Sequence, residues 1–548
     1  MNAILGINFG HDGSAAVVVN GVLKSAIGRE RITRVKKDGR VCEKTINYVL
    51  EVAGIDLNDI TAVAFSSYFY QPEDHAQGSY IRFFDVQGNP VKSNLVHLVG
   101  GKCFDEYRVA IGDQVKPAIL VQHHMAHAAS AFYTSPFERA ACFSLDASGV
   151  HPEFCSLFAI GAYKELKYFY CPGIMAGNVY SVFTSQLGIG PGLTKAGTTM
   201  ALAAFGEIQE YANDWANDFA SWYKRPFQNS DAVHTQYLWT KWTGKSPHEN
   251  FPPMKDPDTE VKNHAASLQY MFERCLVSWT NRLYEETRSF NDDNLVLAGG
   301  SFLNSDVNMR LKQETPFKRI HLFPACGDDG TAAGAALYLS HSLMGQPRHK
   351  YKPSDYMYLG KDYTPMNKQQ DELDYDSLAK DISKGKIVAW FQGRSEFGPR
   401  ALGNRSFLAD PRSLEMKDRI NLKVKHREWF RPFAPAVLEE EKSEWFDIDF
   451  ESKLMLFITR ILKPELIPAV AHIDNSARVQ TVSESDNPRF YKLIKSFGKL
   501  TNVPVLLNTS LNDNNEPLVE TPEDARRLFE RTDIEILVIG DQVIRKSS

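Results

Sequence analysis

Short apolar runs separated by polar turns open the chain, and the same arrangement returns later. The runs ILGINFG, SAAVVV and GVLKSAI occupy the first 27 residues, and the last two meet at Asn20-Gly21. Asn-Gly is a strong signal for a two-residue hairpin, because both positions tolerate a positive φ angle. From residue 140 the runs AACFSLDASG, FCSLFAIGA and ELKYFYC repeat this plan. The pattern therefore predicts a duplicated element of three strands.

Helical and strand-like segments follow each copy of this element. TINYVLEVAGI and TAVAFSSY follow the first copy, while an amphipathic run over residues 262–290 and NLVLAGGSF follow the second. Apolar residues recur at intervals of three or four along the long run, so one face of the predicted helix should be buried. These residues are Leu268, Phe272, Cys275, Trp279 and Leu283. The segments predict a duplicated mixed β-sheet with flanking helices.

A polar stretch with two prolines, GQPRHKYKPSDY at residues 345–356, is typical of a linker. Beyond it, KIVAWFQG, VLLNTS and EILVIGD favour strands, whereas LEMKDRINLKV and TPEDARRLFERT favour helices. Thr521 and Pro522 suit the N-cap and first position of the last helix. We therefore predict two α/β domains, residues 1–350 and 351–548, although a length of 548 residues allows three or four folding units.

The composition is that of an ordinary globular protein, with 43% hydrophobic and 24% charged residues. The net charge of −5 is spread along the chain, which argues against a surface for nucleic acid or anionic membranes. No stretch approaches the ~20 apolar residues of a membrane span, and the start of the chain lacks signal-peptide features. The seven cysteines contain no C-x-x-C pair. We expect a cytoplasmic protein with reduced thiols that binds neither nucleic acid nor membranes.

The segment VQHHMAHAASAF places His123 and His127 one helical turn apart. Both imidazoles then lie on one helix face, as a metal site requires, although such pairs also occur as surface or capping residues. Asp146 ends the first strand of the second copy, and Asp328 and Asp329 precede a small-residue helix. Two imidazoles with two carboxylates would suit iron(II), manganese or zinc better than magnesium.

Glycine-rich turns in the first domain are candidates for binding phosphate or a nucleotide. FGHDGSAA and LDASG, which ends at Gly149, lie at equivalent places in the two copies. Backbone N–H groups in such turns can approach phosphate oxygens. LAGGSFLN places Gly299 and Gly300 directly after an apolar strand, where a flat nucleoside could lie against the backbone. Each turn is equally compatible with an ordinary strand end.

Arginines gather in the second domain among glycine, proline and aromatic residues. The segments GRSEFGPRALGNRSFLADPR and LKVKHREWFRPFAPAV carry Arg394, Arg400, Arg405, Lys425, Arg427 and Arg431. Such side chains can bind several phosphate oxygens in bidentate fashion. A solvated basic face is the alternative, which the apolar neighbours disfavour. The pattern favours a site for phosphate groups.

Nine motifs, in their order along the chain, resemble the nodulation-factor and antibiotic O-carbamoyltransferase family. They are GHDGSA, ERITRVK, HHMAHAASAF, SLDASG, LAGGSFLN, GDDGTAAGAAL, GRSEFGPRALGNRS, REWFRPFAPAV and LLNTSLND. The resemblance covers nearly all 548 residues, and GRSEFGPRALGNRS is highly specific. It implies an α/β protein with an N-terminal domain of the actin-like ATPase superfold, close to the subunit that transfers threonylcarbamoyl to tRNA. The C-terminal domain would be YrdC-like.

The resemblance also implies a reaction. The C-terminal domain would form carbamoyl-adenylate from carbamoyl phosphate and ATP with Mg, and the N-terminal domain would transfer the carbamoyl group to a hydroxyl of a small-molecule acceptor. Iron(II) would be bound by His123, His127, Asp146 and Asp328, with His11 as a base near the acceptor. Arg400, Lys425 and Arg431 would act in catalysis. The other residues expected to bind carbamoyl phosphate or the nucleotide are Lys36, Gly149, Gly299, Gly300, Asn304, Arg405, Arg478, Asn508 and Ser510.

One segment departs from the family's pattern. Thr198 and MALAAFG stand where the family has a lysine and a run like MGLAPYG, so contacts to the nucleotide or acceptor there are not predicted. Two other functions remain as alternatives. One is threonylcarbamoyl transfer to tRNA, which the acidic balance and the GPRALGNRS block disfavour, and the other is a non-catalytic ATP-binding regulator. The sequence identifies no acceptor and leaves open whether the chain forms a homodimer.

Overall fold

The computed structural model describes residues 1–39, 41–66, 80–91, 101–147, 155–213, 239–240, 243–246, 250–251, 256–364 and 373–546. The chain divides into two compact units. The first comprises Met1–Lys24 and Gly39–Lys350, and the second comprises Ser25–Asp38 and Tyr351–Ser548. The chain thus enters the second unit briefly near its start, returns to the first, and enters the second again after residue 350.

The first unit contains two β-sheets. The strands of one sheet are β1 (Ala3–Asn8), β2 (Ser14–Val19), β3 (Val22–Gly28), β4 (Ile60–Ser66), β5 (Ile81–Phe84), β6 (Phe104–Ile111) and β7 (Gln114–Val121). Those of the other are β8 (Arg139–Leu145), β9 (Ser156–Ala162), β10 (Glu165–Tyr170), β11 (Asn294–Ala298) and β12 (Arg319–Leu322). Every residue of β1 and β11 is buried, as expected for central strands covered on both faces.

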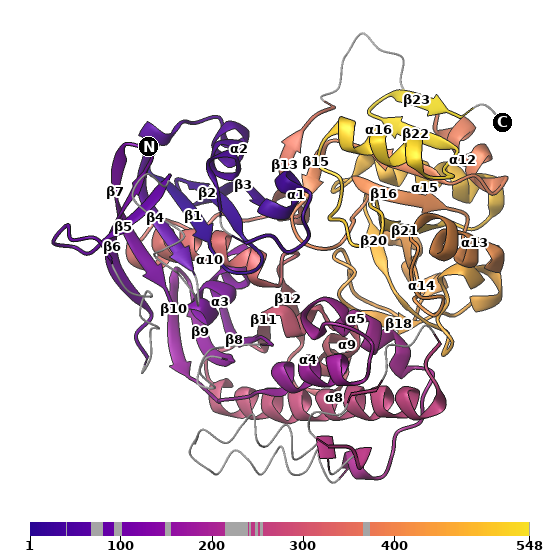
Figure 1. Ribbon diagram of the computed structural model, residues 1–548, viewed down its shortest axis with the longest axis horizontal. Helices are drawn as coiled ribbons and strands as arrows, with labels where there is room; N and C mark the ends of the chain where they lie inside the picture. The colour runs from indigo at the N-terminus through magenta and orange to yellow at the C-terminus, as the bar shows by residue number, and fades with distance from the viewer. Residues whose placement is uncertain are drawn as a thin grey trace. The chain divides into compact units, whose positions relative to one another are not determined.

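The two sheets repeat one strand order. The first runs β3-β2-β1-β4-β7, with β6 and β5 added at its edge, and the second runs β10-β9-β8-β11-β12 (Figure 1). In the first sheet β1 is antiparallel to β2 and parallel to β4, and in the second sheet β8 is antiparallel to β9 and parallel to β11. The predicted duplicated mixed sheet is therefore confirmed. The added strands β5 and β6 were not predicted, because their apolar residues do not alternate regularly.

Two helices at equivalent places join the halves of the first unit. Helix α3 (His123–Thr134) follows β7, and helix α10 (Thr331–Tyr338) follows η5 (Asp328–Gly330) after β12. A Cβ atom at Gly334 would lie 1.8 Å from the carbonyl oxygen of Ala126, so the two helices touch backbone to backbone. This close packing makes one core from both halves, which explains why the chain forms two units and not three or four.

The second half contains the further helices α4 (Ala176–Gln186), α5 (Gly192–Ala203), α8 (Thr259–Thr287) and α9 (Ser305–Glu314), of which α8 packs against β8 and against the other three. Helix α2 (Glu43–Ala53) belongs to the first half and packs against β2. Figure 1 shows the long α8 running beneath α4, α5 and α9. The predicted apolar face of α8 is buried, and the helix begins where Asp258 accepts the N–H of Val261. Of the described helices, none combines the length and apolar character needed to cross a membrane.

The second unit is built on one mixed sheet in the order β20-β17-β21-β16-β14-β22-β23. Its strands are β14 (Val388–Phe391), β16 (Arg405–Ala409), β17 (Ala434–Leu438), β20 (Gln480–Val482), β21 (Val505–Ser510), β22 (Ile536–Ile539) and β23 (Gln542–Arg545). Two small sheets pair β13 (Tyr358–Asp362) with β15 (Arg394–Glu396), and β18 (Ile458–Arg460) with β19 (Ser476–Arg478). The strands predicted from KIVAWFQG, VLLNTS and EILVIGD are present as β14, β21 and β22.

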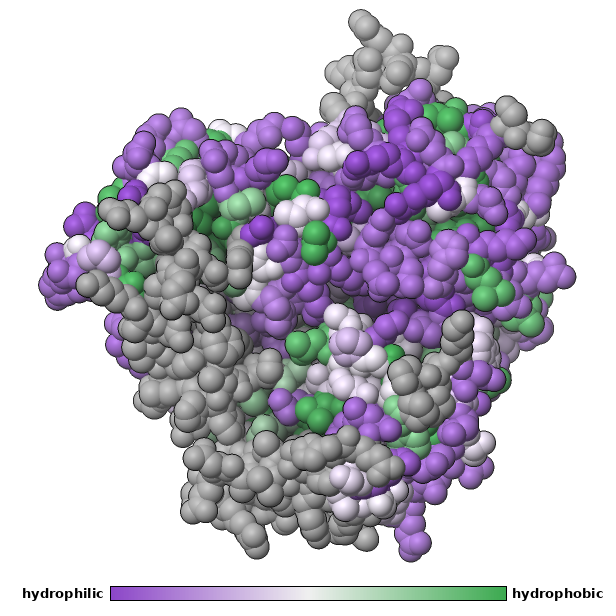
Figure 2. Space-filling model, in the orientation of Figure 1, coloured by the Kyte–Doolittle hydropathy of each residue, from purple (hydrophilic) through white to green (hydrophobic). Residues whose placement is uncertain are grey.

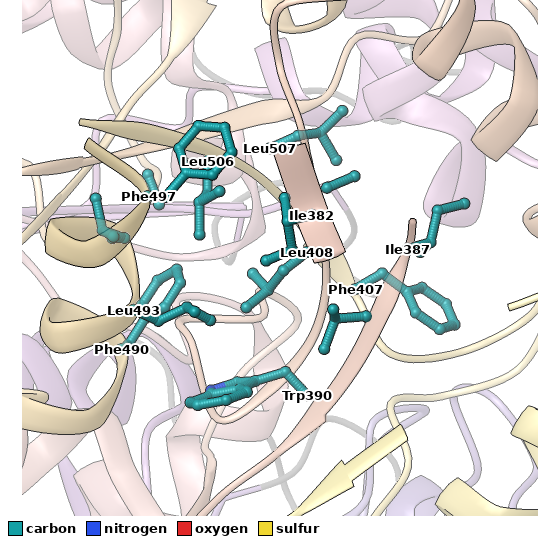
Figure 3. Packing of buried hydrophobic residues seen from close by; sticks show 14 of the residues in the cluster. Ile382, Ile387, Trp390, Phe407, Leu408, Phe490, Leu493, Phe497, Leu506 and Leu507 are labelled. Atoms are coloured by element: carbon teal, nitrogen blue, oxygen red, sulfur yellow. The ribbon is translucent and has the colours of Figure 1, made fainter. Parts of the chain in front are cut away.

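The helices of the second unit are α1 (Arg29–Thr33), α11 (Pro353–Met357), α12 (Tyr375–Ser383), α13 (Leu414–Arg419), α14 (Lys442–Trp445), α15 (Pro488–Thr501) and α16 (Pro522–Arg531), with the π-helical turn η7 (Ile420–Val424) extending α13. Those from α12 to α16 contribute buried apolar side chains to the core around the sheet. In Figure 3, Phe490 and Leu493 of α15 point towards Trp390 of the sheet. Thr521 caps α16 as predicted, because its hydroxyl accepts the Asp524 N–H.

All seven cysteines are free thiols, as expected. The exposed large apolar residues are distributed along the chain and include Val35, Leu414, Leu422 and Ile473. On the face drawn in Figure 2, hydrophilic residues predominate and the apolar ones form separate small areas. Such isolated exposure is ordinary for a globular protein.

Candidate functional site

Four side chains that the sequence proposed as metal ligands lie together in the first unit. His123 and His127 lie in the first turns of α3, Asp146 directly follows β8, and Asp328 begins the turn before α10. One nitrogen or oxygen atom of each residue lies within 4.8 Å of the corresponding atoms of the other three. The duplicated fold brings these segments together, because α3 and α10 follow equivalent strands and pack against each other.

The distances between these atoms fit one small cation. His127 Nε2 lies 3.0 Å from His123 Nε2, 3.1 Å from Asp146 Oδ2 and 3.3 Å from Asp328 Oδ1. His123 Nε2 lies 3.4 Å from Asp328 Oδ1 and 3.8 Å from Asp146 Oδ2. A tetrahedral ion with ligands at about 2.1 Å separates its ligand atoms by about 3.4 Å. The four residues therefore match the size and the mixed nitrogen and oxygen set of a transition-metal site.

The charges within this metal cluster balance one another. Burial lowers the pKa of His127, but hydrogen bonds to Asp146 and Asp328 and the charges of both acids outweigh burial and raise the pKa to about 9. Burial raises the pKa of Asp328, yet the charge and hydrogen bond of His123 take it well below the ordinary value. Both carboxylates thus stay ionised beside the imidazoles. A bound divalent cation can also neutralise these two acids.

Neighbouring hydroxyl groups orient the histidine rings. Ser66, at the end of β4, places Oγ 3.3 Å from His123 Nδ1 and leaves Nε2 facing the cluster. Such outer contacts fix the ring orientation of metal-binding histidines. His124 Nδ1 lies 2.7 Å from Ser144 Oγ, so this ring points towards β8 and away from the other two. Among the described residues, His127 Nδ1 has no hydrogen-bond partner.

His11 lies at the exposed side of the metal cluster. Its Nδ1 is 2.9 Å from Asp12 Oδ2, and its Nε2 is 3.7 Å from Asp328 Oδ2. The His11 side chain is 41% exposed, in contrast to the buried rings of His123 and His127. His11 is therefore accessible to solvent, whereas His123 and His127 are shielded from it.

The glycines after β11 have an explanation within the protein. Gly299 has a φ angle of +100°, and a Cβ there would lie 2.1 Å from the carbonyl oxygen of Leu145. A Cβ at Gly300 would lie 2.9 Å from Asp146 Oδ1 and would crowd this carboxylate. The ends of β8 and β11 approach so closely that side chains do not fit, which places Asp146 in the cluster.

Two further residues, Asn304 and Gly149, were expected at a nucleotide site. Asn304 caps α9, where its Oδ1 accepts the Val307 N–H at 3.2 Å and its Nδ2 donates to Gln269 Oε1 at 3.0 Å. The structure does not bring Asn304 into the metal cluster. Gly149 lies outside the described residues.

A second cluster, which we call the cationic cluster, surrounds Lys425 in the second unit. It consists of Lys36, Arg400, Lys425, Arg427, Arg431 and Arg478. Burial takes the pKa of Lys425 well below its ordinary value, and the charges of Arg427 and Arg431 lower it further. Burial also lowers the pKa of Arg400, as do the charges of Arg478 and Arg431.

Neutral oxygens and few acids face these cations. Lys425 Nζ donates to Ser510 Oγ at 3.1 Å, to the Asn512 carbonyl at 2.8 Å and to Asn512 Oδ1 at 2.5 Å. Glu428 Oε2 is 3.7 Å from Arg431 Nη1 and only partly offsets the lowered pKa of Arg431. In the described part of the chain, these cations, of which Lys425 is buried and most others are half-buried, lie near few acids, and an anion would offset their mutual repulsion.

The loop that carries Arg400 is held by a buried acid. Glu396 Oε1 accepts the backbone N–H groups of Leu402, Asn404 and Arg405 at 2.7, 2.8 and 3.0 Å. Asn508 lies against the same loop, because its Nδ2 donates to the carbonyl of Ala401 at 3.3 Å. Glu396 was not singled out from the sequence, since no motif marks a carboxylate that accepts backbone N–H groups.

Arg405 is used by the fold and not by the cationic cluster. It is fully buried, and its guanidinium group lies 3.6 Å from the ring centre of Phe391. Its Nη1 donates to the carbonyls of Gln392 at 2.6 Å and Asn404 at 3.1 Å. Its Nη2 donates to the carbonyl of Gly393 at 3.1 Å, so both Nη groups bind backbone carbonyls, and the expected phosphate-binding role of Arg405 stays a prediction. Arg394 likewise donates to two backbone carbonyls.

Two family descriptions cover most of the chain. Carbamoyltransferase N-terminus matches residues 3–337, and Carbamoyltransferase C-terminus matches residues 379–546. The chain belongs to the carbamoyltransferase family. This membership makes the protein a transferase enzyme and confirms the resemblance found in the sequence.

Relatives extend over both units of this carbamoyltransferase. Uncharacterized protein sll1178 of Synechocystis sp. is 34% identical over 100% of this chain and 97% of its own length. Nodulation protein NolNO of Sinorhizobium fredii is 34% identical over 98% of this chain and 79% of its own. The 3'-hydroxymethylcephem-O-carbamoyltransferase of Streptomyces clavuligerus is 32% identical over 65% of this chain and 66% of its own. Among solved structures, component A of the Acidaminococcus fermentans (R)-2-hydroxyglutaryl-CoA dehydratase is 14% identical over 62% of this chain and 97% of its own. Its TM-score of 0.32 is too low to carry an inference.

Proposed function

We propose that this carbamoyltransferase is an ATP-dependent O-carbamoyltransferase with one chemical step in each unit. The observation that carries the proposal is the contrast between a charge-balanced cluster suited to a metal ion and a cationic cluster suited to phosphate groups. Activation of a donor with ATP needs a site for phosphate groups, and a bound cation can assist the later transfer to a hydroxyl. The family resemblance supplies the order of the two steps.

Carbamoyl-adenylate forms in the second unit. Carbamoyl phosphate loses its phosphate to water, an oxygen of the resulting carbamate attacks the α-phosphorus of ATP, and pyrophosphate leaves. Carbamate needs this activation because nitrogen deactivates its carbonyl group and it has no leaving group. Arg400, Lys425 and Arg431 neutralise the negative charge of the phosphate groups as the new bond forms. Arg478, Asn508 and Ser510 complete this site.

Transfer to the acceptor takes place in the first unit. The hydroxyl oxygen of the acceptor attacks the carbamoyl carbon, AMP leaves, and His11 takes the hydroxyl proton. His123, His127, Asp146 and Asp328 would hold an iron(II) ion, and their mixed donor set would also accommodate manganese or zinc. Such an ion would supply positive charge to offset the negative charge that develops during transfer.

The acceptor is a hydroxyl group of a small molecule. This part of the proposal rests on relatives, since one similar protein carries the name of a cephem O-carbamoyltransferase and another that of a nodulation protein. The distribution of acidic residues, with a net charge of −5, disfavours tRNA as the acceptor.

The test supplies the purified protein with Mg, ATP, carbamoyl phosphate and candidate alcohols. Pyrophosphate release and a gain of one carbamoyl group on the alcohol, measured by mass spectrometry, follow the two steps separately. We expect pyrophosphate only when ATP and carbamoyl phosphate are both present. ATP binding without pyrophosphate formation would indicate a regulator, and a carbamoyl adduct on tRNA would indicate the other transfer reaction.

A further inference from the structure

A short segment from the start of the chain is part of the second unit. Residues Ser25–Asp38, which we call the strap, separate from the first unit within β3 and contain α1. After α1 the strap turns through two residues in the left-handed region, Arg34 at φ 62° and Lys37 at φ 57°. Side chains other than glycine adopt this conformation rarely, so surrounding contacts must hold the turn in place.

Arg34 makes the contacts that fix the strap to the second unit. Its Nη1 donates to the carbonyl of Leu518 at 2.5 Å, and its Nη2 donates to the carbonyl of Pro517 at 2.8 Å. Its Nε lies 3.8 Å from Asp524 Oδ1, near the start of α16. One guanidinium group thus bridges the turn of the strap and the loop that follows β21.

The rest of the strap is fastened around Arg34. Arg31 is 5% exposed, and its Nη2 donates to the carbonyl of Gly398 at 2.7 Å, in the loop that carries Arg400. Glu30 Oε2 accepts the N–H of Lys37 at 2.9 Å and closes the turn. The backbone on both sides of Lys36 is therefore fixed.

Lys36 stands between these fixed points, with its side chain exposed. The positive charge of Lys36 acts on Lys425, whose pKa it helps to lower. The charge of Lys36 thus acts on Lys425 together with those of Arg427 and Arg431. More than 380 residues separate Lys36 from them in the sequence. The fixed backbone of the strap thus carries Lys36 at a place where its charge acts on Lys425.

We propose that Arg34 is a positioning residue, which holds the strap so that Lys36 binds a phosphate oxygen of the substrate in the second unit. This inference rests on the proposed adenylate-forming function. Arg34 itself contacts carbonyl groups and Asp524, so it acts on the reaction through Lys36. The phosphate group can belong to carbamoyl phosphate or to ATP, and the kinetics below distinguish them.

A double-mutant cycle in the full chain tests this coupling. Arg34→Ala, Lys36→Ala and the double variant are compared by the rate of pyrophosphate formation, with carbamoyl phosphate and ATP varied in turn. We expect each single change to lower kcat/KM about tenfold, as the loss of one charge-assisted contact does. The double variant should be no slower than the slower single variant, because both changes remove the same interaction.

The substrate whose KM rises identifies the phosphate group that Lys36 binds. A rise for carbamoyl phosphate alone assigns Lys36 to the donor, and a rise for ATP alone assigns it to the nucleotide. Arg34→Lys retains the charge but not the paired donors, and should restore part of the rate. If Arg34→Ala fails to fold, Arg34→Gln replaces it in the cycle.

Arg526→Ala is the matched control in the same unit. Arg526 lies on α16 and donates to Gln542 Oε1 at 2.9 Å, outside the cationic cluster, so this variant should keep the normal rate. The inference would be overturned if the double variant lost kcat/KM by the product of the two single losses. A normal rate for Arg34→Ala or Lys36→Ala would also overturn it. In all these outcomes the proposed function stands, whereas it fails if the unaltered protein forms no pyrophosphate.

Discussion

The metal cluster and the cationic cluster differ in how their charges are balanced. In the first unit two carboxylates face two imidazoles, and the pKa of His127 rises to about 9 because its acidic neighbours outweigh burial. In the second unit burial and like charges lower the pKa of Lys425, Arg427 and Arg400 together. The first cluster can persist without a ligand, whereas the second gains stability when an anion binds. The excess positive charge of the second cluster thus indicates an anionic ligand, whereas the first cluster is matched to a cation by its nitrogen and oxygen donors.

The largest expected effect comes from breaking the balanced cluster. Asp328→Asn should empty the metal site and lower carbamoyl transfer about a thousandfold, because charge stabilisation by a metal ion is worth several kcal/mol. Pyrophosphate formation should continue, since that step belongs to the other unit. Elemental analysis measures the metal, and mass spectrometry measures the carbamoylated alcohol.

The neighbouring acid provides the control for this experiment. Asp329 lies next to Asp328 but outside the group of four ligand atoms within 4.8 Å. Asp329→Asn should therefore keep its metal and its transfer rate. Full metal content in Asp328→Asn, or equal loss of both half-reactions, would contradict the division of roles between the two clusters.

A smaller effect is expected when one cation is removed from the second cluster. Arg431→Ala should slow pyrophosphate formation roughly ten- to a hundredfold, the usual consequence of losing a charge-assisted hydrogen bond to phosphate. Its metal content should stay normal, which separates it from Asp328→Asn. An assay of pyrophosphate measures the rate, and elemental analysis measures the metal content. An unchanged rate of pyrophosphate formation would remove Arg431 from the proposed site.

The two arginines of the GPRALGNRS block should differ in their effects on stability. Arg405→Ala should lower the free energy of unfolding by about 2–4 kcal/mol, because three carbonyl groups lose their donors. Arg400→Ala should leave this free energy unchanged or raise it, since it removes a cation repelled by Arg431 and Arg478. Urea unfolding of both variants without ligand measures the difference, and equal losses would contradict it.

The smallest expected effect is a dependence of stability on alkaline pH. The pKa of Lys425 in the folded protein lies below the ordinary value of 10.5, so between these values the unfolded chain binds more protons. The free energy of unfolding therefore rises with pH in this window, by at most about 1.4 kcal/mol per pH unit. Lys425→Met should lack this contribution, and a difference between the two proteins that does not change with pH would refute it.

Particular elements illustrate what could be predicted from the sequence. The repeat of apolar runs predicted the duplicated sheet, and the apolar spacing of three or four residues along 262–290 predicted the buried face of α8. Both predictions depend on local periodicity. Residue type and spacing indicated His123, His127, Asp146 and the pair Asp328 and Asp329 as candidate metal ligands, and the family resemblance selected Asp328 from that pair. Arg400 and Arg405 were indistinguishable, since both lie in one motif and differ only in the groups that surround them.

By itself the sequence determined the periodic elements, the family and the candidate residues, because hydrophobic period, turn chemistry and motif order are local properties of a chain. The tertiary structure alone decided which candidates share a site. The strap is the plainest case, since Ser25–Asp38 lies early in the sequence but belongs to the second unit. Contacts between distant segments, such as Arg34 with Pro517 and Leu518, arise from packing, which no local pattern records.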